Sequence, residues 1–260
     1  SNCLVLPYMS NKTMLKNADG KVEHTNLSQG IFKEIIHRLT EMGQYNDYNG
    51  AFNMEYLKVI LDRLVKEYGV EILFHSTIAS VASQGRKIHS VDVATVAGII
   101  TFKADCFIDA TGDANLSALA GCNFQLGREE DSLCQPMTLC FRVMGVSWED
   151  ICMHRAEMNE VYQKFQKEGK IKNPRENILL FETMVPGEVH FNTTRIIKRN
   201  PTNQCDVRQA EMEGREQMIE MINFLKENIP IFKEAQLTHS AISIGVRESR
   251  MVEGEHCLTG

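Results

Sequence analysis

The stretch from Asp105 to Gly121, DCFIDATGDANLSALAG, constrains the fold of this 260-residue chain more than any other segment. Its apolar run, Cys106–Ile108, is uninterrupted, which is typical of a strand buried on both faces of a parallel sheet. Turn-forming residues follow at 109–113, and apolar residues then recur at helical spacing until Gly121. The segment therefore predicts a strand, a tight turn and a short helix.

The predicted turn has two residues with a definite role. Gly112 allows a ligand or a second backbone to come close, and Asp113 is expected to cap the helix. Exposed amides at such a helix start favour an anion such as phosphate. Many turns of this type in doubly wound sheets bind nothing, so the pattern alone leaves both possibilities open.

Composition narrows the class of protein. With 43% hydrophobic and 24% charged residues, the chain is typical of a globular protein that forms one large or two smaller domains. The net charge of -6 comes with no extended basic block, so a nucleic-acid partner is not expected. The longest weakly polar run, 93–100, is too short to span a membrane.

Cysteine and histidine spacing indicates no metal site. None of the eight cysteines forms a C-x-x-C pair, and no two of the eight histidines have H-x-x-x-H spacing. Scattered thiols and the lack of a signal-peptide pattern predict a cytoplasmic protein. The start at Ser1, without an initiator Met, suggests a fragment.

Periodicity predicts the remaining elements. A short apolar anchor at 4–8 and a polar loop at 11–26 precede the rest. The predicted helices cover 31–42, 54–68, 147–168 and 206–225, with Asn53 as an N-cap. A strand at 70–74 leads into a three-strand meander formed by 78–81, 88–93 and 99–102. The alternating segment 136–145 predicts a half-buried antiparallel strand, with further strands at 178–181, 189–191 and 237–244.

The segment Ala110-Thr111-Gly112-Asp113 resembles the Ala-Thr-Gly-Asp segment of FAD-dependent oxidoreductases of the glutathione-reductase-like superfamily. Four further segments resemble the same family in the same order. They are Gly30–Ile35, Gln135–Leu139, Phe191–Arg195 and Ile244–Arg250. The resemblance runs from about Leu4 and covers nearly all of the chain. It implies FAD as the cofactor.

The sequence departs from this family in one respect. A flavin domain of this type opens with G-x-G-x-x-G, yet none of the 17 glycines lies two positions from another. The resemblance therefore implies an internal fragment without the N-terminal G-x-G-x-x-G turn. On that basis the chain alone is expected to be inactive and not to retain FAD.

The expected fold is α/β, a partial Rossmann-like flavin-binding domain with a β-meander, plus a mainly antiparallel α+β substrate domain. The partial FAD-binding domain is expected at 1–125 and the substrate domain at 126–244. Residues 245–260 are expected to return toward the FAD-binding domain.

The resemblance also implies cofactor contacts. Ala110, Thr111 and Gly112 would pass near the FAD phosphates and ribose, with Asp113 as the cap of the same turn. Ile78 and Val81 would lie near the adenine, mostly through backbone groups. Ordinary strand packing is the alternative for these two residues.

Gln135, Asn192 and Arg247 are the candidates to face the substrate. Alternatively, Arg247 pairs with a carboxylate such as Glu248, and the two amides satisfy loop backbone groups. His75 and His190 border predicted strands and are candidate acid–base groups, although a structural histidine is the commoner case. No catalytic residue is singled out.

The function implied for the full-length parent is an FAD-dependent oxidoreductase that transfers a hydride between a small organic substrate and flavin. The alternative is a non-catalytic binding or scaffold domain that has lost its nucleotide site. The substrate, the electron acceptor and the oligomeric state stay open.

Overall fold

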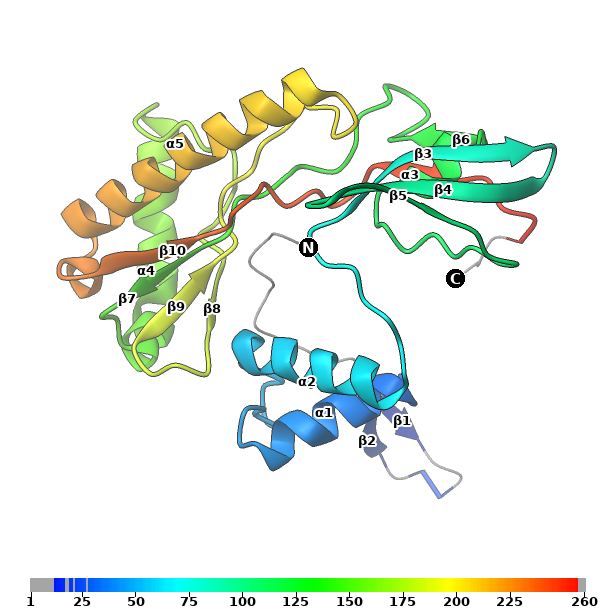
Figure 1. Ribbon diagram of the computed structural model, residues 1–260. Helices are drawn as coiled ribbons and strands as arrows, with labels where there is room; N and C mark the ends of the chain where they lie inside the picture. The colour runs from blue at the N-terminus through cyan, green and yellow to red at the C-terminus, as the bar shows by residue number, and fades with distance from the viewer. Residues whose placement is uncertain (1–11, 17–18, 21, 27, 257–260) are drawn as a thin grey trace. The chain divides into compact units, whose positions relative to one another are not determined.

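The structure, a computed structural model, describes residues 12–16, 19–20, 22–26 and 28–256. It confirms the mixed α/β class, with five α-helices and several antiparallel sheets among the described residues (Figure 1). The chain forms two compact units. The first contains the residues up to Glu71, Thr138–Arg195 and Glu211–Gly245, and the second contains Ile72–Met137, Ile196–Ala210 and the residues from Val246 onward.

Two helices of the first unit confirm the periodicity argument. Helix α1 spans Ile31–Glu41 and α2 spans Met54–Glu67. The side chain of Asn53 caps α2 by accepting the Glu55 N–H at 3.1 Å. Apolar residues of both helices share one buried cluster that includes Phe52 before the cap, and the partly buried Leu57 of α2 packs against it.

The N-terminal region is not the polar loop expected at 11–26. Strands β1 (Lys12–Lys16) and β2 (Val22–Asn26) pair antiparallel there, with Lys12 opposite Asn26. Backbone pairing satisfies the amides of a polar segment as well as those of an apolar one, so polarity alone did not reveal the hairpin. The apolar anchor expected at 4–8, together with Asn11, lies outside the described residues.

The first unit contains a four-stranded antiparallel sheet (Figure 1). Its strand order is β10-β7-β9-β8. The strands are β7 (Phe141–Met144), β8 (Leu180–Glu182), β9 (Glu188–Phe191) and β10 (Gln236–Ser240). The segment 136–145 is therefore a strand as expected, although its ladder is shorter, and β10 ends before the expected 244.

The apolar face of this sheet carries the core. Phe141 on β7 stacks on Phe191 on β9 with ring centroids 4.7 Å apart, and Phe191 also contacts Phe232. Helices α4 (Trp148–Lys167) and α5 (Gln204–Asn228) supply Tyr162 and Phe224, which meet edge to face. Phe232 belongs to the short helix η1 (Pro230–Phe232). The predicted half-burial holds for β7, whose side chains alternate between buried and half-buried, whereas residues 137–140 before it are all buried.

The second unit contains the predicted meander. Strands β3 (Thr77–Gln84), β4 (Lys87–Thr95) and β5 (Gly98–Phe102) pair antiparallel in that order. Helix α3 (Asn115–Leu119) is the short helix expected before Gly121. Strands β6 (Phe124–Leu126) and β11 (Arg250–Val252) form a further antiparallel pair that the sequence did not predict.

Two expected strands are wrong. Neither 70–74 nor Cys106–Ile108 is in a strand, and Ile108 is 86% exposed instead of buried. An apolar run becomes a buried parallel strand only when strands pair on both of its sides, and no parallel pairing occurs among the described residues. The predicted burial of Leu61 is also wrong, since 42% of it is exposed, whereas Leu64 is buried and Ile35 is half-buried.

Candidate functional site

The carboxylate of Asp109 organises the turn before α3. Its Oδ1 accepts the backbone N–H of Thr111 at 3.1 Å and the Thr111 hydroxyl at 2.7 Å. Its Oδ2 accepts the backbone N–H and the hydroxyl of Ser117, each at 2.8 Å. Partial burial alone would raise the pKa of Asp109, but these hydrogen bonds outweigh burial and lower it to about 2. The group is therefore a carboxylate at neutral pH.

Asp113 does not cap the helix, contrary to the sequence prediction. The N-cap position is Ala114, which has no capping side chain, and the hydroxyl of Thr111 instead accepts the first helical N–H, that of Asn115, at 2.8 Å. The carboxylate of Asp113 instead accepts the hydroxyl of Ser249 at 2.6 Å. Arg250 donates to the Asp113 carbonyl at 2.9 Å and to Oδ1 of Asn115 at 3.0 Å. The two family-like segments around 113 and 249 are therefore directly joined.

The turn fits some parts of FAD better than others. Gly112 has a φ of +81°, which favours glycine, and nothing lies within 4 Å of the place where a Cβ would be. Ala110, Thr111 and Gly112 are exposed, so a ligand can lie against their backbone. However, α3 has only five residues, and the Thr111, Asn115 and Ser117 amides are already hydrogen-bonded. These three amides are therefore not available to a phosphate.

Ile78 and Val81 lie on β3, which packs against α3 in the same unit. They pair with Val93 and Val91 on β4, and both side chains are half-buried. The hydroxyl of Ser83 on the same strand donates to the Ala120 carbonyl at 3.4 Å. The expected adenine-side strand and the expected phosphate-side turn therefore belong to one packed structure.

The three substrate-side candidates fall into two groups. Gln135 is exposed, and its backbone N–H donates to the carboxylate of Glu248 at 2.7 Å. Glu248 directly follows Arg247, which is also exposed. Asn192 belongs to the first unit and is 4% exposed, and its amide oxygen is 3.8 Å from the Cys140 sulfur.

The family-like segment after β9 has a structural role. The Thr193 hydroxyl donates to the Leu179 carbonyl at 2.8 Å and accepts its N–H at 3.1 Å. The Thr194 hydroxyl makes the same two kinds of bond to Leu139, at 3.0 and 2.7 Å. Both threonines are fully buried. These hydroxyls satisfy backbone groups where the regular ladder ends.

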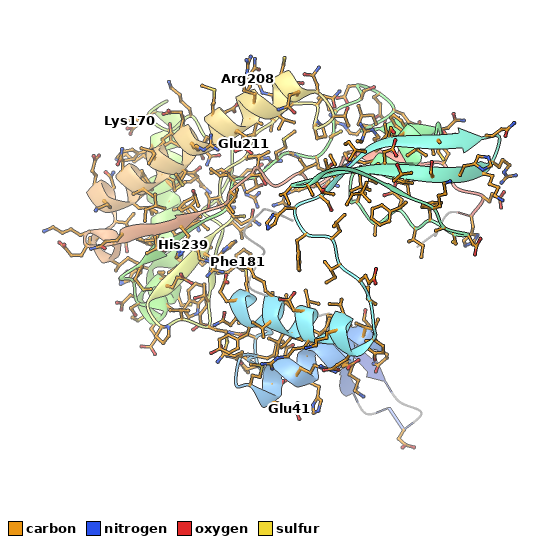
Figure 2. All side chains as sticks on the ribbon, viewed as in Figure 1. Glu41, Lys170, Phe181, Arg208, Glu211 and His239 are labelled. Atoms are coloured by element: carbon orange, nitrogen blue, oxygen red, sulfur yellow. The ribbon has the colours of Figure 1, made fainter. Side chains whose placement is uncertain are left out.

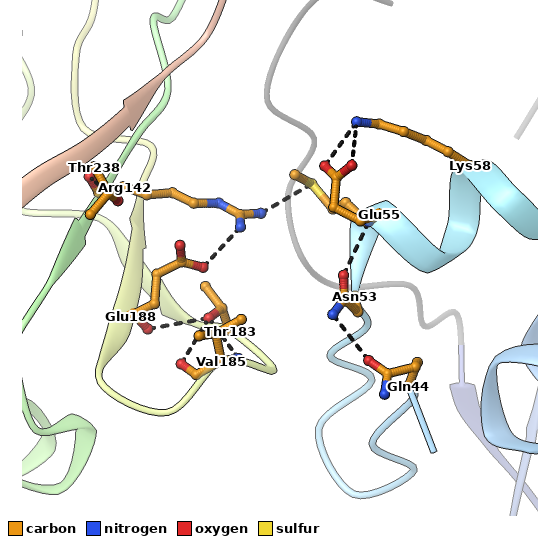
Figure 3. Close-up of polar contacts among 10 residues, drawn as sticks. Gln44, Asn53, Glu55, Lys58, Arg142, Thr183, Val185, Glu188 and Thr238 are labelled. Carbon is orange, nitrogen blue, oxygen red and sulfur yellow. Dashed lines mark hydrogen bonds and ion pairs between the residues drawn. The ribbon is translucent and has the colours of Figure 1, made fainter. Parts of the chain in front are cut away.

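Sequence reasoning named His190 but missed its two charged neighbours on the sheet, Arg142 and Glu188. Arg142 on β7 donates to Glu188 on β9 at 2.8 Å and contacts the Met54 sulfur at 3.3 Å (Figure 3). His190 lies opposite Arg142 in the ladder and is fully buried. Burial, reinforced by the Arg142 charge, lowers the pKa of His190 to about 3, so the imidazole is neutral.

A signal for this group was present in the sequence. Glu188 and His190 alternate with Val189 and Phe191, which places both polar side chains on one face of a predicted strand. The pattern predicts a half-solvated strand, whereas the structure buries both faces. His75, the other candidate acid–base residue, is exposed.

Two wider searches of the described residues bear on the function. No group of three or more His, Cys, Asp or Glu side chains among them is arranged to hold a metal ion. None of the helices in that part of the chain is both long enough and apolar enough to cross a bilayer.

The fold and the turn define a mixed α/β protein in which a glycine turn precedes a short helix packed on an antiparallel ribbon. Residues 1–260 match the family described as FAD dependent oxidoreductase, so the chain belongs to that family. A search of curated proteins finds no significant match. Family membership supports a flavin-dependent oxidoreductase role for the protein.

Proposed function

We propose that this protein acts in the transfer of a hydride between a small organic substrate and FAD, as a part of a longer flavoprotein of the glutathione-reductase-like type. The observation that carries the proposal is the Asp109-organised turn, which occurs in a chain that matches the oxidoreductase family over residues 1–260. FAD would supply the redox chemistry.

The chain's own residues would bind and orient the reactants. Ala110, Thr111 and Gly112 would present exposed backbone to the cofactor, and Asp109 would hold their conformation. Ile78 and Val81 would flank the adenine from β3. The link from Gln135 to Glu248 would fix the segment that carries Arg247, a candidate clamp for an anionic substrate group. Asn192 is proposed separately as a substrate contact.

The alternative is a non-catalytic binding or scaffold domain, and one observation favours it. Asp109 and Asp113 place two acidic groups in the turn where the family resemblance puts the FAD phosphates. Negative charges there oppose phosphate binding. The two functions differ in whether the chain binds FAD at all.

Titration of the 260-residue chain with FAD, followed by flavin fluorescence and calorimetry, tests the proposal. We expect binding weaker than low micromolar, because nanomolar binding needs about 12 kcal/mol and one short turn supplies a small part of it. Gly112→Ala should weaken this binding further. Gly121→Ala is the matched control, since both glycines have positive φ (+81° and +84°) with open space around them.

The results separate three cases. Equal effects of the two substitutions would show that the turn does not contact FAD. Saturable nanomolar binding would contradict the expected weakness and leave the oxidoreductase role intact. No binding at any FAD concentration would favour the scaffold.

A further inference from the structure

A row of four side chains crosses the sheet of the first unit. His239, Arg142, His190 and Phe181 are direct partners in the ladders of β10, β7, β9 and β8. Residues directly opposite one another project from the same face of a sheet, so the row lies on the face away from the Phe141–Phe191 stack. Figure 2 labels its two ends, His239 and Phe181.

The two middle residues of this row, Arg142 and His190, have buried nitrogen atoms without a hydrogen-bond partner among the described residues. His190 has 0% exposure, and among the described residues neither Nδ1 nor Nε2 has a hydrogen-bond partner. The Nε of its neighbour Arg142 is in the same condition. A buried polar atom left unpaired costs roughly 1–3 kcal/mol, so such atoms call for a partner that fills the site.

The ion pair beside His190 favours an uncharged ligand over an anion. Arg142 already pairs with Glu188, whose side chain is 5% exposed, so the two charges balance. A second buried anion next to Glu188 would be repelled and would lose its hydration. A neutral oxygen avoids both penalties.

The unpaired atoms also match one functional group. A neutral imidazole offers one N–H donor and one bare nitrogen acceptor, and Arg142 Nε offers a donor. A hydroxyl can donate to the bare nitrogen while its oxygen accepts the Nε–H. A carbonyl oxygen can accept from the imidazole N–H and from Nε–H.

We propose that Arg142 and His190 form a binding site for the hydroxyl or carbonyl oxygen of a small neutral organic ligand, an alcohol or the corresponding carbonyl compound. Naming that ligand as the substrate rests on the proposed function, whereas the binding site itself does not. Access requires displacement of the side chains that bury His190. The Met54 sulfur, 3.3 Å from Nη2 of Arg142, is a weak acceptor, so its contact with the guanidinium is easily given up when a ligand approaches.

Nitrogen NMR of the chain labelled with ¹⁵N-histidine tests the site directly, without flavin or turnover. The His190 signals are assigned by their loss in His190→Gln. The probes are 1,2-propanediol, its carbonyl counterpart hydroxyacetone, and acetate as an anion of similar size. We expect saturable shifts of the His190 ring nitrogens with the first two probes and none with acetate.

Substitutions then assign the contacts by affinity, measured by calorimetry. Arg142→Lys keeps the charge but removes Nε, and His190→Gln removes the imidazole. Each should weaken binding of 1,2-propanediol at least tenfold. His239→Gln, at the exposed end of the same row, should leave binding unchanged.

Several outcomes would overturn the proposal. One is a His190 spectrum that already shows hydrogen-bonded nitrogens and ignores every probe, which would mean that water alone fills the site. Another is a shift of the His190 ring nitrogens with acetate alone. A third is an affinity of His190→Gln for 1,2-propanediol that equals that of the wild type. The wild-type spectra decide the question even if a variant does not fold. Probe binding without FAD binding would favour the scaffold over the proposed function and leave this site intact. FAD binding without probe binding would refute this site alone.

Discussion

The hydroxyl of Ser249 donates to Oδ1 of Asp113 at 2.6 Å and joins two segments that are 136 residues apart in the sequence. Ser249 is buried, and Arg250 beside it adds two further bonds to the same turn. The bonds hold the turn before α3 against the segment that carries Arg247. The cofactor-side and substrate-side candidates of the second unit are thus parts of one hydrogen-bonded structure.

We therefore expect Ser249→Ala to destabilise the second unit by about 1 kcal/mol, because a partly buried carboxylate loses a hydrogen bond. Urea unfolding measures the change in the free energy of unfolding. Ser90→Ala on β4 of the same unit is the control and should have a smaller effect. An equal effect of the two substitutions would mean that the Ser249 bond contributes nothing specific.

Asp109→Asn should loosen the turn itself. An amide cannot accept on both sides as the carboxylate does, so the bonds to Thr111 or to Ser117 are lost, at about 1–3 kcal/mol. Faster hydrogen exchange of the Ser117 amide would report the loss locally. Asp105→Asn, exposed and just before the turn, should leave that amide unchanged.

The stability that the Asp109 hydrogen bonds contribute should decrease in acid. The pKa of Asp109 is about 2 in the folded chain and 3.8 where the carboxyl group makes no contacts. The ionised carboxylate therefore stabilises the fold fully above pH 3.8. It is lost as the pH falls from there through 2. Asp109→Asn should remove this part of the acid dependence, and an unchanged acid transition would contradict the assigned hydrogen bonds.

The elements predicted most accurately are those that a local sequence pattern determines. The stripes of α1 and α2, the Asn53 cap and the β3–β5 meander depend on contacts close in sequence. The segment Cys106–Ile108 failed because a buried strand needs neighbours on both sides, and its own residues cannot report whether they are present.

The candidate site was predicted in part for a similar reason. The turn at 109–113 and its short helix were found, but Asp113 was expected to accept a helix N–H that the Thr111 hydroxyl accepts instead, since both residues precede the helix and carry acceptor oxygens. The pairing of Arg142 with His190 depends on the register between β7 and β9, and on burial of both sheet faces. A single sequence contains neither piece of information.

The ion pair of Arg142 and Glu188 should show the behaviour of a buried pair. Glu188→Ala should cost about 3–5 kcal/mol, because it leaves the guanidinium buried without its counter-charge. Arg142→Met together with Glu188→Leu should recover most of that loss. Chemical denaturation of the single and double variants measures both effects.

A comparison comes from the pair of Arg38 and Glu67, which is shorter at 2.6 Å than the 2.8 Å of the Arg142–Glu188 pair but has side chains 24% and 53% exposed. Glu67→Ala should destabilise the chain far less than Glu188→Ala, since water screens an exposed pair. Similar losses in the two variants would show that burial does not set the strength of the Arg142–Glu188 pair.

Acid should unfold the first unit through His190. Its pKa is about 3 in the folded chain because burial and the Arg142 charge oppose protonation, whereas an unfolded histidine titrates near 6.5. The unfolded state therefore binds one more proton below 6.5, and stability falls as the pH decreases. The slope approaches about 1.4 kcal/mol per pH unit.

Urea unfolding of the wild type and His190→Phe between pH 6.5 and 5 should show this slope only in the wild type. His89→Gln, exposed on β4, should keep it. Parallel pH profiles for the wild type and His190→Phe would mean that the imidazole is not held neutral in the folded sheet.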